Sequence, residues 1–144
     1  MCFKRQIPKG NASEDLIDGL LKPLGARQVI YLDTEYYCST ANEALEAIVY
    51  SLKTIPLPQY IPEKRDCDDF SIRAKYLIDE KLGINSVGIV LGDTYMGYHA
   101  YNVILTKEDV NSKVILTFFE PQTGEFWSKE DSMMKSYLLD IVII

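Results

Sequence analysis

The chain has 144 residues, of which 47% are apolar and 25% charged, and it carries a net charge of −6. Unspecific nucleic-acid binding depends on cationic contacts to phosphates, so this acidic balance argues against it. No apolar run approaches the ~20 residues that a membrane-spanning helix needs. We therefore expect an ordinary globular protein, with neither nucleic acid nor membrane as a partner.

Three cysteines, Cys2, Cys38 and Cys67, make an odd count without CxxC spacing. This count excludes a complete disulfide framework and gives no sign of a zinc ribbon. The first residues lack the apolar core of a signal peptide. We therefore predict one domain over residues 1–144, cytoplasmic, with free thiols and without a cofactor.

The first part of the chain favours helices. Ser13 is a suitable N-cap for a short helix through Leu21, and residues 27–32 are β-like. Thr40 precedes a longer helix over residues 41–53, whose apolar residues recur at helical spacing.

The second part begins with an irregular, proline-rich stretch over residues 55–65, then a helix, and strands dominate the remainder. Ser128 begins a short helix near the end of the chain. Helices succeeded by a run of strands predict an α+β fold, with N-terminal helices packed against an antiparallel sheet. The expected elements of this part are a helix over 67–81 and strands over 85–91, 98–106 and 113–120, with 140–144 ending the last helix or forming a strand.

The helix over 67–81 starts at a cysteine. Asp66 is a good N-cap, so Cys67 is expected to be the first helical residue. The helix dipole there favours a thiolate, whereas the neighbouring carboxylates of Asp68 and Asp69 repel it. The alternative is a small, buried cysteine with a packing role.

A histidine and a glutamate are expected to meet in the hairpin after this helix. A loop at residues 108–111 places Leu105 opposite Val114 and His99 opposite Glu120. Opposed residues of an antiparallel pair have Cβ atoms ~4.5–5.5 Å apart, so the glutamate can orient the imidazole. A slip of one residue would break this pairing.

Three short segments carry a resemblance to a known family: CDDF at 67–70, HAYN at 99–102 and EPQ at 120–122. In order and spacing they resemble the papain-like cysteine peptidase superfamily, on its transglutaminase-like side. Bacterial transglutaminase-like cysteine peptidases, the papain-like domain of some fungal agglutinins, and small phage or archaeal proteins are similar. The resemblance covers about residues 60–127.

This resemblance implies a papain-like fold, with the cysteine helix packed against a sheet that carries the other two groups. It implies a triad of Cys67 as nucleophile, His99 as general base and acid, and Glu120 as the residue that orients His99. The expected reaction is acyl transfer through a thioester, as in a peptidase, an amidase or a transglutaminase. The partner would be a peptide or protein substrate.

The chain departs from papain at Ile61, where papain has a glutamine that helps to bind the oxyanion. Other polar and aromatic side chains near the expected site are candidates for that role or for substrate binding. They are Gln59, Tyr60, Asn102, Gln122 and Trp127. Asn102 has the opposite strand parity to His99, so we expect it on the other side of the sheet.

A second interpretation keeps the fold but not the chemistry: an inert module that binds a peptide or a glycan in a tyrosine-lined groove. The side chains available for such a groove are Tyr60, Tyr95, Tyr98, Tyr101 and Trp127. In that case Cys67 should be unreactive.

A third interpretation is a site for a hard cation such as calcium, formed by Asp66, Asp68 and Asp69 together with His99 and Glu120. The need for Asp66 as a cap weakens it. So does the ~100° angle between consecutive residues of a helix, which should separate the other two aspartates. We therefore expect no metal at the main site.

Overall fold

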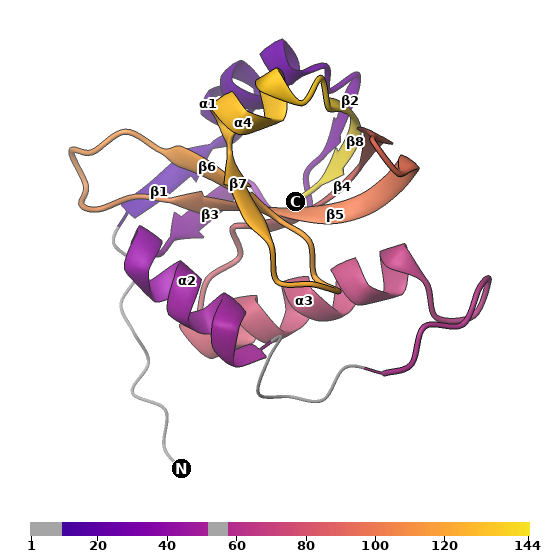
Figure 1. Ribbon diagram of the computed structural model, residues 1–144. Coiled ribbons are helices and arrows are strands. Elements are labelled where there is room, and N and C mark those ends of the chain that lie inside the picture. Colours follow the sequence, from indigo (N-terminus) through magenta and orange to yellow (C-terminus); the bar gives the residue numbers. More distant parts are fainter. Residues whose placement is uncertain (1–9, 52–57) are drawn as a thin grey trace.

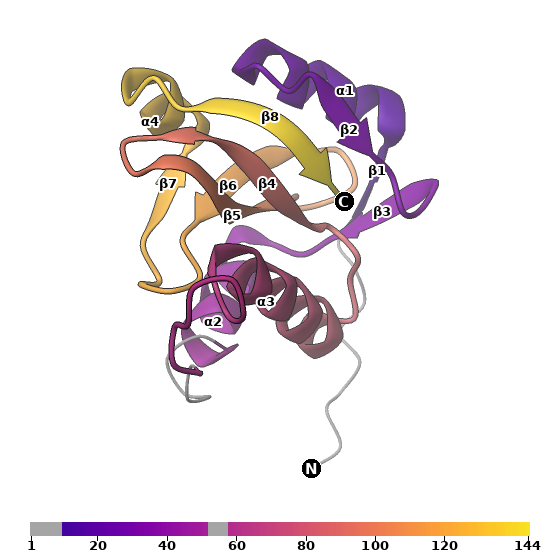
Figure 2. The ribbon, with the colours of Figure 1, turned by 90° about the vertical axis from the view of Figure 1, so that its right-hand side faces the viewer.

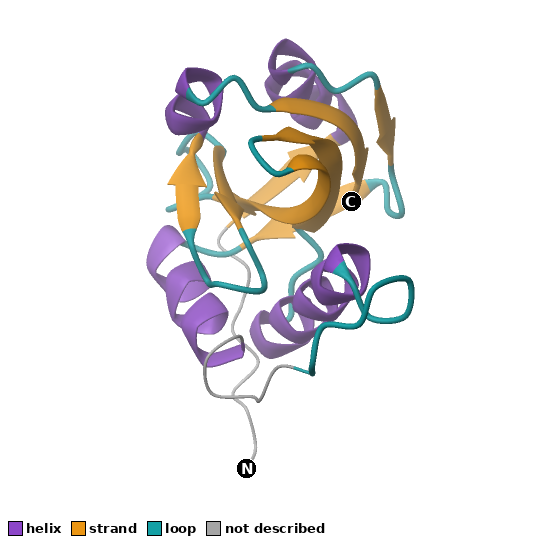
Figure 3. Ribbon diagram, turned by 45° about the vertical axis from the view of Figure 1, so that its right-hand side comes forward, coloured by secondary structure: helices purple, strands orange, loops and turns teal. Residues whose placement is uncertain are grey.

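The computed structural model describes residues 10–51 and 58–144, which form a curved six-stranded sheet with helices on both faces (Figure 3). The strand order is β2-β8-β4-β5-β6-β7, and β1 and β3 form a separate two-stranded sheet. The strands are β1 (Gly10–Ser13), β2 (Gln28–Ile30), β3 (Glu35–Cys38), β4 (Val87–Thr94), β5 (Gly97–Thr106), β6 (Ile115–Phe119), β7 (Phe126–Ser128) and β8 (Leu138–Ile143). The helices are α1 (Glu14–Leu21), the 3-10 turn η1 (Lys22–Leu24), α2 (Ala41–Val49), α3 (Cys67–Leu82) and α4 (Lys129–Met134).

The helices divide into two layers. Helices α2 and α3 cover one face of the six-stranded sheet, and α1 and α4 lie on the other side (Figures 1 and 2). Each layer has its own core. The larger one includes Ile17 and Tyr36 with the sheet residue Tyr101, and the smaller one packs Ile78 and other residues of α2 and α3 against Ile104.

The expected order of helices first and strands afterwards is wrong. Three of the eight strands, β1, β2 and β3, lie before α2. Strand β2 pairs in parallel with β8, with Gln28 opposite Ile141, so the sheet is mixed rather than antiparallel. Strand β2 lies within residues 27–32, whose β-like character is predicted from the sequence, whereas the four-residue strands β1 and β3 are too short to show the alternation by which a strand is recognised.

The helix boundaries agree with the capping residues. The Ser13 side chain accepts a hydrogen bond from Leu16 N at 3.3 Å, and Thr40 begins α2. Helix α3 starts at Cys67 and ends at Gly83, whose φ of 66° is the left-handed conformation that glycine adopts at low cost. Ser128 begins α4 as expected. Cys2 and positions 52–53 of the expected second helix lie outside the described residues.

The hairpin of β5 and β6 has a different register from the one expected. Leu105 pairs with Leu116 rather than with Val114, and Asn102 pairs with Phe119. The connection is thus longer by two residues than the expected loop. Because side chains alternate with a period of two, a shift of two residues keeps every side chain on its expected face.

Within the part of the chain that the structure describes, no helix has both the length and the apolar character needed to cross a bilayer.

Candidate ligand-binding site

His99 and Glu120 form the polar centre of the site. The imidazole Nε2 lies 2.6 Å from Glu120 Oε2, and the two side chains are only 12% and 8% exposed. The pair lies on neighbouring strand ends of β5 and β6. In the observed register the two residues are diagonal neighbours, which still allows long side chains to meet.

The Glu120 carboxylate is held in place by the turn after it. Its Oε1 accepts a hydrogen bond from Gln122 N at 3.1 Å. Its backbone carbonyl accepts from Gly124 N at 2.8 Å, and its own N–H donates to Glu125 O at 2.7 Å. The φ of 75° at Gly124 allows this tight turn. The carboxylate therefore has a fixed position beside the imidazole.

A cavity opens next to this pair, with an empty volume of about 480 Å³ including its mouth. Its lining combines apolar surface with a few convergent polar groups, which is the usual composition of a small-ligand site. Its lining includes Tyr95, His99, Tyr101, Glu120, Trp127 and Tyr137. They come from the turn between β4 and β5, from β5 and β7, from the start of the turn after β6, and from the segment after α4.

Aromatic rings form the walls of the cavity. The Trp127 ring lies 5.4 Å from the Tyr101 ring and 5.9 Å from the Tyr137 ring, centroid to centroid. Tyr95, at the tip of the β4–β5 hairpin, stacks on Tyr137 at 6.3 Å. The contact between Tyr95 and Tyr137 requires the start of β8 to lie close to β4. Gly92 allows this close approach, because a Cβ atom at this position would lie only 2.2 Å from Leu138 O.

Two charged residues lie at the same cavity. Lys135 Nζ is 5.4 Å from the centroid of Trp127 and 5.6 Å from that of Tyr137, within the range of cation–π attraction. The same ammonium group lies 3.5 Å from Glu125 Oε1. Both charged side chains are partly exposed, so a ligand can reach them from solvent.

Two polar atoms of the aromatic walls are buried and have no partner among the described residues. They are the Tyr101 hydroxyl and the indole Nε1 of Trp127, each with less than 1 Å² of exposed surface. Burial raises the pKa of Tyr101, so this phenol stays protonated and remains a hydrogen-bond donor. Buried donors are normally satisfied, so these two atoms are exceptions within the aromatic wall.

Cys67 lies at the expected helix start and is not part of the cavity. It is half-buried, and its carbonyl accepts a hydrogen bond from Ser71 Oγ at 2.9 Å. Among the described residues, no hydrogen bond joins its thiol to His99, and Cys67 does not line the cavity. The structure brings His99 and Glu120 together, while a shared role with Cys67 stays a prediction.

Asn102 faces α3, as its strand parity predicts. Its Nδ2 donates to Ser71 O at 2.9 Å and to Gly88 O at 3.1 Å, and the side chain is fully buried. These bonds tie β5 to α3 and β4, so Asn102 holds the scaffold instead of lining the cavity.

The other predicted site residues divide into two groups. Gln122 and Trp127 line the cavity, whereas Gln59 and Tyr60 are exposed in the stretch before α3 and do not. Of the tyrosines expected in a groove, Tyr98 is outside the lining and donates a hydrogen bond to Asp140. Tyr95 and Tyr101 belong to the cavity, as the groove interpretation expects.

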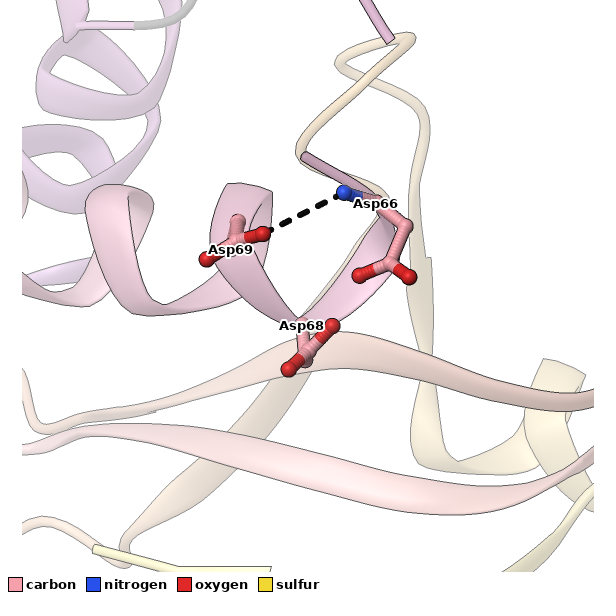
Figure 4. A group of neighbouring side chains, drawn as sticks. All are labelled: Asp66, Asp68 and Asp69. Atoms are coloured by element: carbon pink, nitrogen blue, oxygen red, sulfur yellow. Dashed lines mark hydrogen bonds between the residues drawn. The ribbon is translucent and has the colours of Figure 1, made fainter. Parts of the chain in front are cut away.

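The three aspartates at the start of α3 lie closer together than helix geometry alone suggests. One carboxylate oxygen of each of Asp66, Asp68 and Asp69 lies within 4.8 Å of the others (Figure 4). Asp69 Oδ2 accepts a hydrogen bond from Asp66 N at 3.3 Å. A hydrogen bond with Asp68 raises the pKa of Asp66. The three carboxylates thus lie near one another at the helix start, and His99 and Glu120 are not part of this cluster.

Three residues of the cavity, Tyr137, Glu125 and Lys135, are not among those predicted from the sequence. Glu125 lies in the turn between β6 and β7, whereas Lys135 and Tyr137 reach the cavity because α4 turns the chain back toward the β4–β5 hairpin (Figure 1). A tyrosine that comes after a short helix gives no local signal of a binding role.

The family model of the ricin-type beta-trefoil lectin C-terminal domain matches residues 24–140. The chain belongs to this family. No curated protein matches this lectin C-terminal domain in sequence.

Two solved structures share the fold of this lectin C-terminal domain. One is described as the "PSL1a-E64 complex", with a TM-score of 0.69, 20% sequence identity and coverage of 93% of this chain. The other is Polyporus squamosus lectin bound to the human-type influenza-binding epitope Neu5Aca2-6Galb1-4GlcNAc, with a TM-score of 0.66, 21% identity and the same coverage. The chain spans 51% and 49% of these proteins, or about half their length.

These matches correct the resemblance drawn from the short segments. The predicted membership of the papain-like cysteine peptidase superfamily, with its papain-like fold, is wrong, because the family that matches is a lectin family. The predicted cysteine hydrolase or acyltransferase, and its peptide or protein substrate, are overturned by the same match. Three segments of three or four residues are short patterns, whereas the family model extends over residues 24–140.

Proposed function

We propose that this chain is a carbohydrate-binding module, and that a sugar binds in the cavity beside His99 and Glu120. One observation carries the proposal: aromatic walls and a fixed, polar His99–Glu120 pair converge on one cavity. A pyranose ring has an apolar C–H face and an edge of hydroxyl groups. Aromatic rings cover the first, and a carboxylate with an imidazole forms hydrogen bonds with the second.

The family assignment supports a glycan in preference to a peptide. The chain belongs to a lectin family, and one structural relative is described as bound to a glycan epitope. Because the chain spans about half of that lectin, the cavity itself rather than the relative carries the proposal.

A glycan array tests this function with two matched tyrosine variants. Tyr95 is 78% exposed at the cavity, and Tyr76 is 62% exposed on α3, outside the cavity lining. We expect the wild-type chain to bind a subset of glycans. An aromatic contact is worth ~0.5–1.5 kcal/mol, so Tyr95→Ala should weaken binding by about two- to twelvefold. Tyr76→Ala should leave it unchanged.

Two results would contradict the proposal. One is a wild-type chain that binds no glycan on the array while its near-UV circular dichroism shows native packing. The other is an equal loss of binding in both variants, which would show that the bound glycan does not use the cavity.

A further inference from the structure

We infer that the cavity binds a sugar with a free amino group, whose ammonium takes the place that Lys135 occupies over Trp127 and Tyr137; this inference rests on the proposed function. The Lys135 ammonium lies 5.4 Å and 5.6 Å from the centroids of these two rings and 3.5 Å from Glu125 Oε1. All four residues line the cavity. The chain thus places a cation of its own where aromatic faces and a carboxylate meet, and we call this point the ammonium site.

The ammonium site is open to groups that come from solvent. Lys135 reaches it with a side chain that is 40% exposed, and the Glu125 side chain is 58% exposed. The Trp127 and Tyr137 rings are themselves mostly buried, but the position over their faces is the one that the lysine fills. The lysine is therefore the group that a ligand has to displace.

Displacing Lys135 costs little. Its distance of 3.5 Å from Glu125 is long for a hydrogen bond, and ion pairs between partly exposed side chains contribute little to stability. A long lysine side chain also regains rotamer freedom when it returns to water. A ligand that brings its own ammonium group replaces the lysine without depriving Glu125 or the ring faces of a cation.

The charges of the lining favour a cation over an anion. The carboxylates of Glu120 and Glu125 lie in the lining, against one lysine. Glu120 is already engaged by His99 at 2.6 Å and by Gln122 N at 3.1 Å, so Glu125 is the carboxylate that can pair with a ligand. The net charge of −6 adds a negative potential that attracts cations.

A sugar nitrogen gains from the ammonium site only when it is charged. The negative face of an aromatic ring attracts an ammonium group, whereas an acetylated nitrogen or a hydroxyl group carries no charge. The exposed Tyr95 ring and the His99–Glu120 pair remain for the pyranose ring itself. An amino sugar should therefore bind more tightly than its parent sugar and its N-acetyl derivative.

Trp127, the only tryptophan of the chain, is the reporter of the experiment. Its fluorescence is titrated at neutral pH and low ionic strength with glucosamine, galactosamine and mannosamine, each beside its parent sugar and its N-acetyl derivative. Isothermal titration calorimetry provides a second readout. We expect at least one amino sugar to bind about fivefold or more tightly than both uncharged counterparts. Added salt should reduce this preference, because it screens partly exposed charges.

Two substitutions should change the preference for the amino sugar in opposite directions. Lys135→Gln removes the competing cation and should raise the preference about two- to fivefold. Glu125→Gln removes the opposite charge and should lower it about two- to fivefold. General damage to the fold cannot produce opposite signs. Lys81→Gln is the matched control, because Lys81 Nζ lies over the Tyr50 ring at 3.7 Å, outside the cavity lining, and its loss should leave the preference unchanged.

The outcomes separate this inference from the proposed function. Amino sugars that bind no more tightly than their parent sugars would overturn the inference while the carbohydrate-binding function stands. A preference that fails to rise in Lys135→Gln, or fails to fall in Glu125→Gln, would do the same. A glycan array without any bound glycan, together with no binding of any sugar in the two titrations, would overturn both.

Discussion

His99 and Glu120 are not direct partners across the β5–β6 pair, yet their side chains lie 2.6 Å apart. Asn102 pairs with Phe119, so continuing this register would place His99 opposite Gln122, which is two residues after Glu120. The contact is therefore diagonal, between residues that share one face of the sheet. The turn after Glu120 fixes the carboxylate, and the strand end of β5 brings the imidazole to it.

Glu120 should contribute to stability through this geometry. Glu120→Ala removes the acceptor of Gln122 N and leaves the buried His99 without its partner. Losing a buried hydrogen bond to a charged group costs ~1.5–3 kcal/mol, and we expect a loss of that size in the free energy of unfolding. Glu120→Gln keeps an acceptor oxygen and should lose less. Urea denaturation measures both, and equal losses would show that hydrogen bonding at this position is not the cause.

A shared role of Cys67 with His99 and Glu120 is a prediction from sequence that alkylation kinetics can test. Burial raises the pKa of Cys38 to about 11, whereas Cys67 is half-buried at a helix start. We expect iodoacetamide to modify Cys67 much faster than Cys38 near neutral pH, as read by peptide mass spectrometry. If the three residues act together, His99→Ala slows the reaction at Cys67. An unchanged rate would separate the cysteine from the pair.

The sequence predicts the pair of His99 and Glu120 correctly but its register incorrectly. The expected loop is at residues 108–111, and the observed pairing of Leu105 with Leu116 is two residues away from the expected one. Strand faces repeat every two residues, so an error of two preserves which side chains share a face. Long side chains then bridge the diagonal. An error of one residue would have put Glu120 on the side of α3.

The mixed sheet could not be predicted in the same way, because its pairing is not local. Gln28 of β2 lies opposite Ile141 of β8, at the other end of the chain. Strand β2 has three residues, and its hydrogen bonds come from a strand formed more than a hundred residues later. Tyr137 reaches the cavity through the same C-terminal segment, which explains why the site was only partly predictable.

The Tyr101 hydroxyl should add nothing to stability. This hydroxyl is buried without a partner among the described residues, and an unmet polar group of this kind costs ~1–3 kcal/mol. We expect Tyr101→Phe to leave the free energy of unfolding unchanged or to raise it by up to about 1 kcal/mol. In Tyr36→Phe the lost hydroxyl accepts from Asp33 N at 2.9 Å and donates to Ile144 O at 2.9 Å.

The free energy of unfolding of Tyr36→Phe should therefore fall by about 1–2 kcal/mol, because buried backbone groups would be left unpaired. Thermal and urea unfolding of the two variants side by side make the comparison. A loss in Tyr101→Phe as large as that in Tyr36→Phe would mean that the Tyr101 hydroxyl has a hydrogen-bond partner within the fold.

Asp79 makes stability depend on pH on the α3 side of the sheet. Burial raises its pKa to about 6, and the ion pair with Lys75 at 2.8 Å and the hydrogen bond from Val87 N only partly offset this. Asp33 adds to the rise. Since the folded state binds this proton more tightly than the unfolded chain, with its ordinary value of 3.8, Asp79 stabilises the fold as the pH falls from about 6 toward 4.

When the pH falls from neutral to ~4, the free energy of unfolding of the wild-type chain should therefore rise by up to about 3 kcal/mol relative to that of a variant that lacks the titrating group. The matched variant is Asp79→Asn with Lys75→Met, because replacing Asp79 alone would leave the buried Lys75 ammonium unpaired. Urea denaturation of both proteins across this range gives the difference directly, so that the titration of other carboxylates cancels. If the wild-type chain instead loses stability relative to the double variant on acidification, the ion pair outweighs the burial of Asp79.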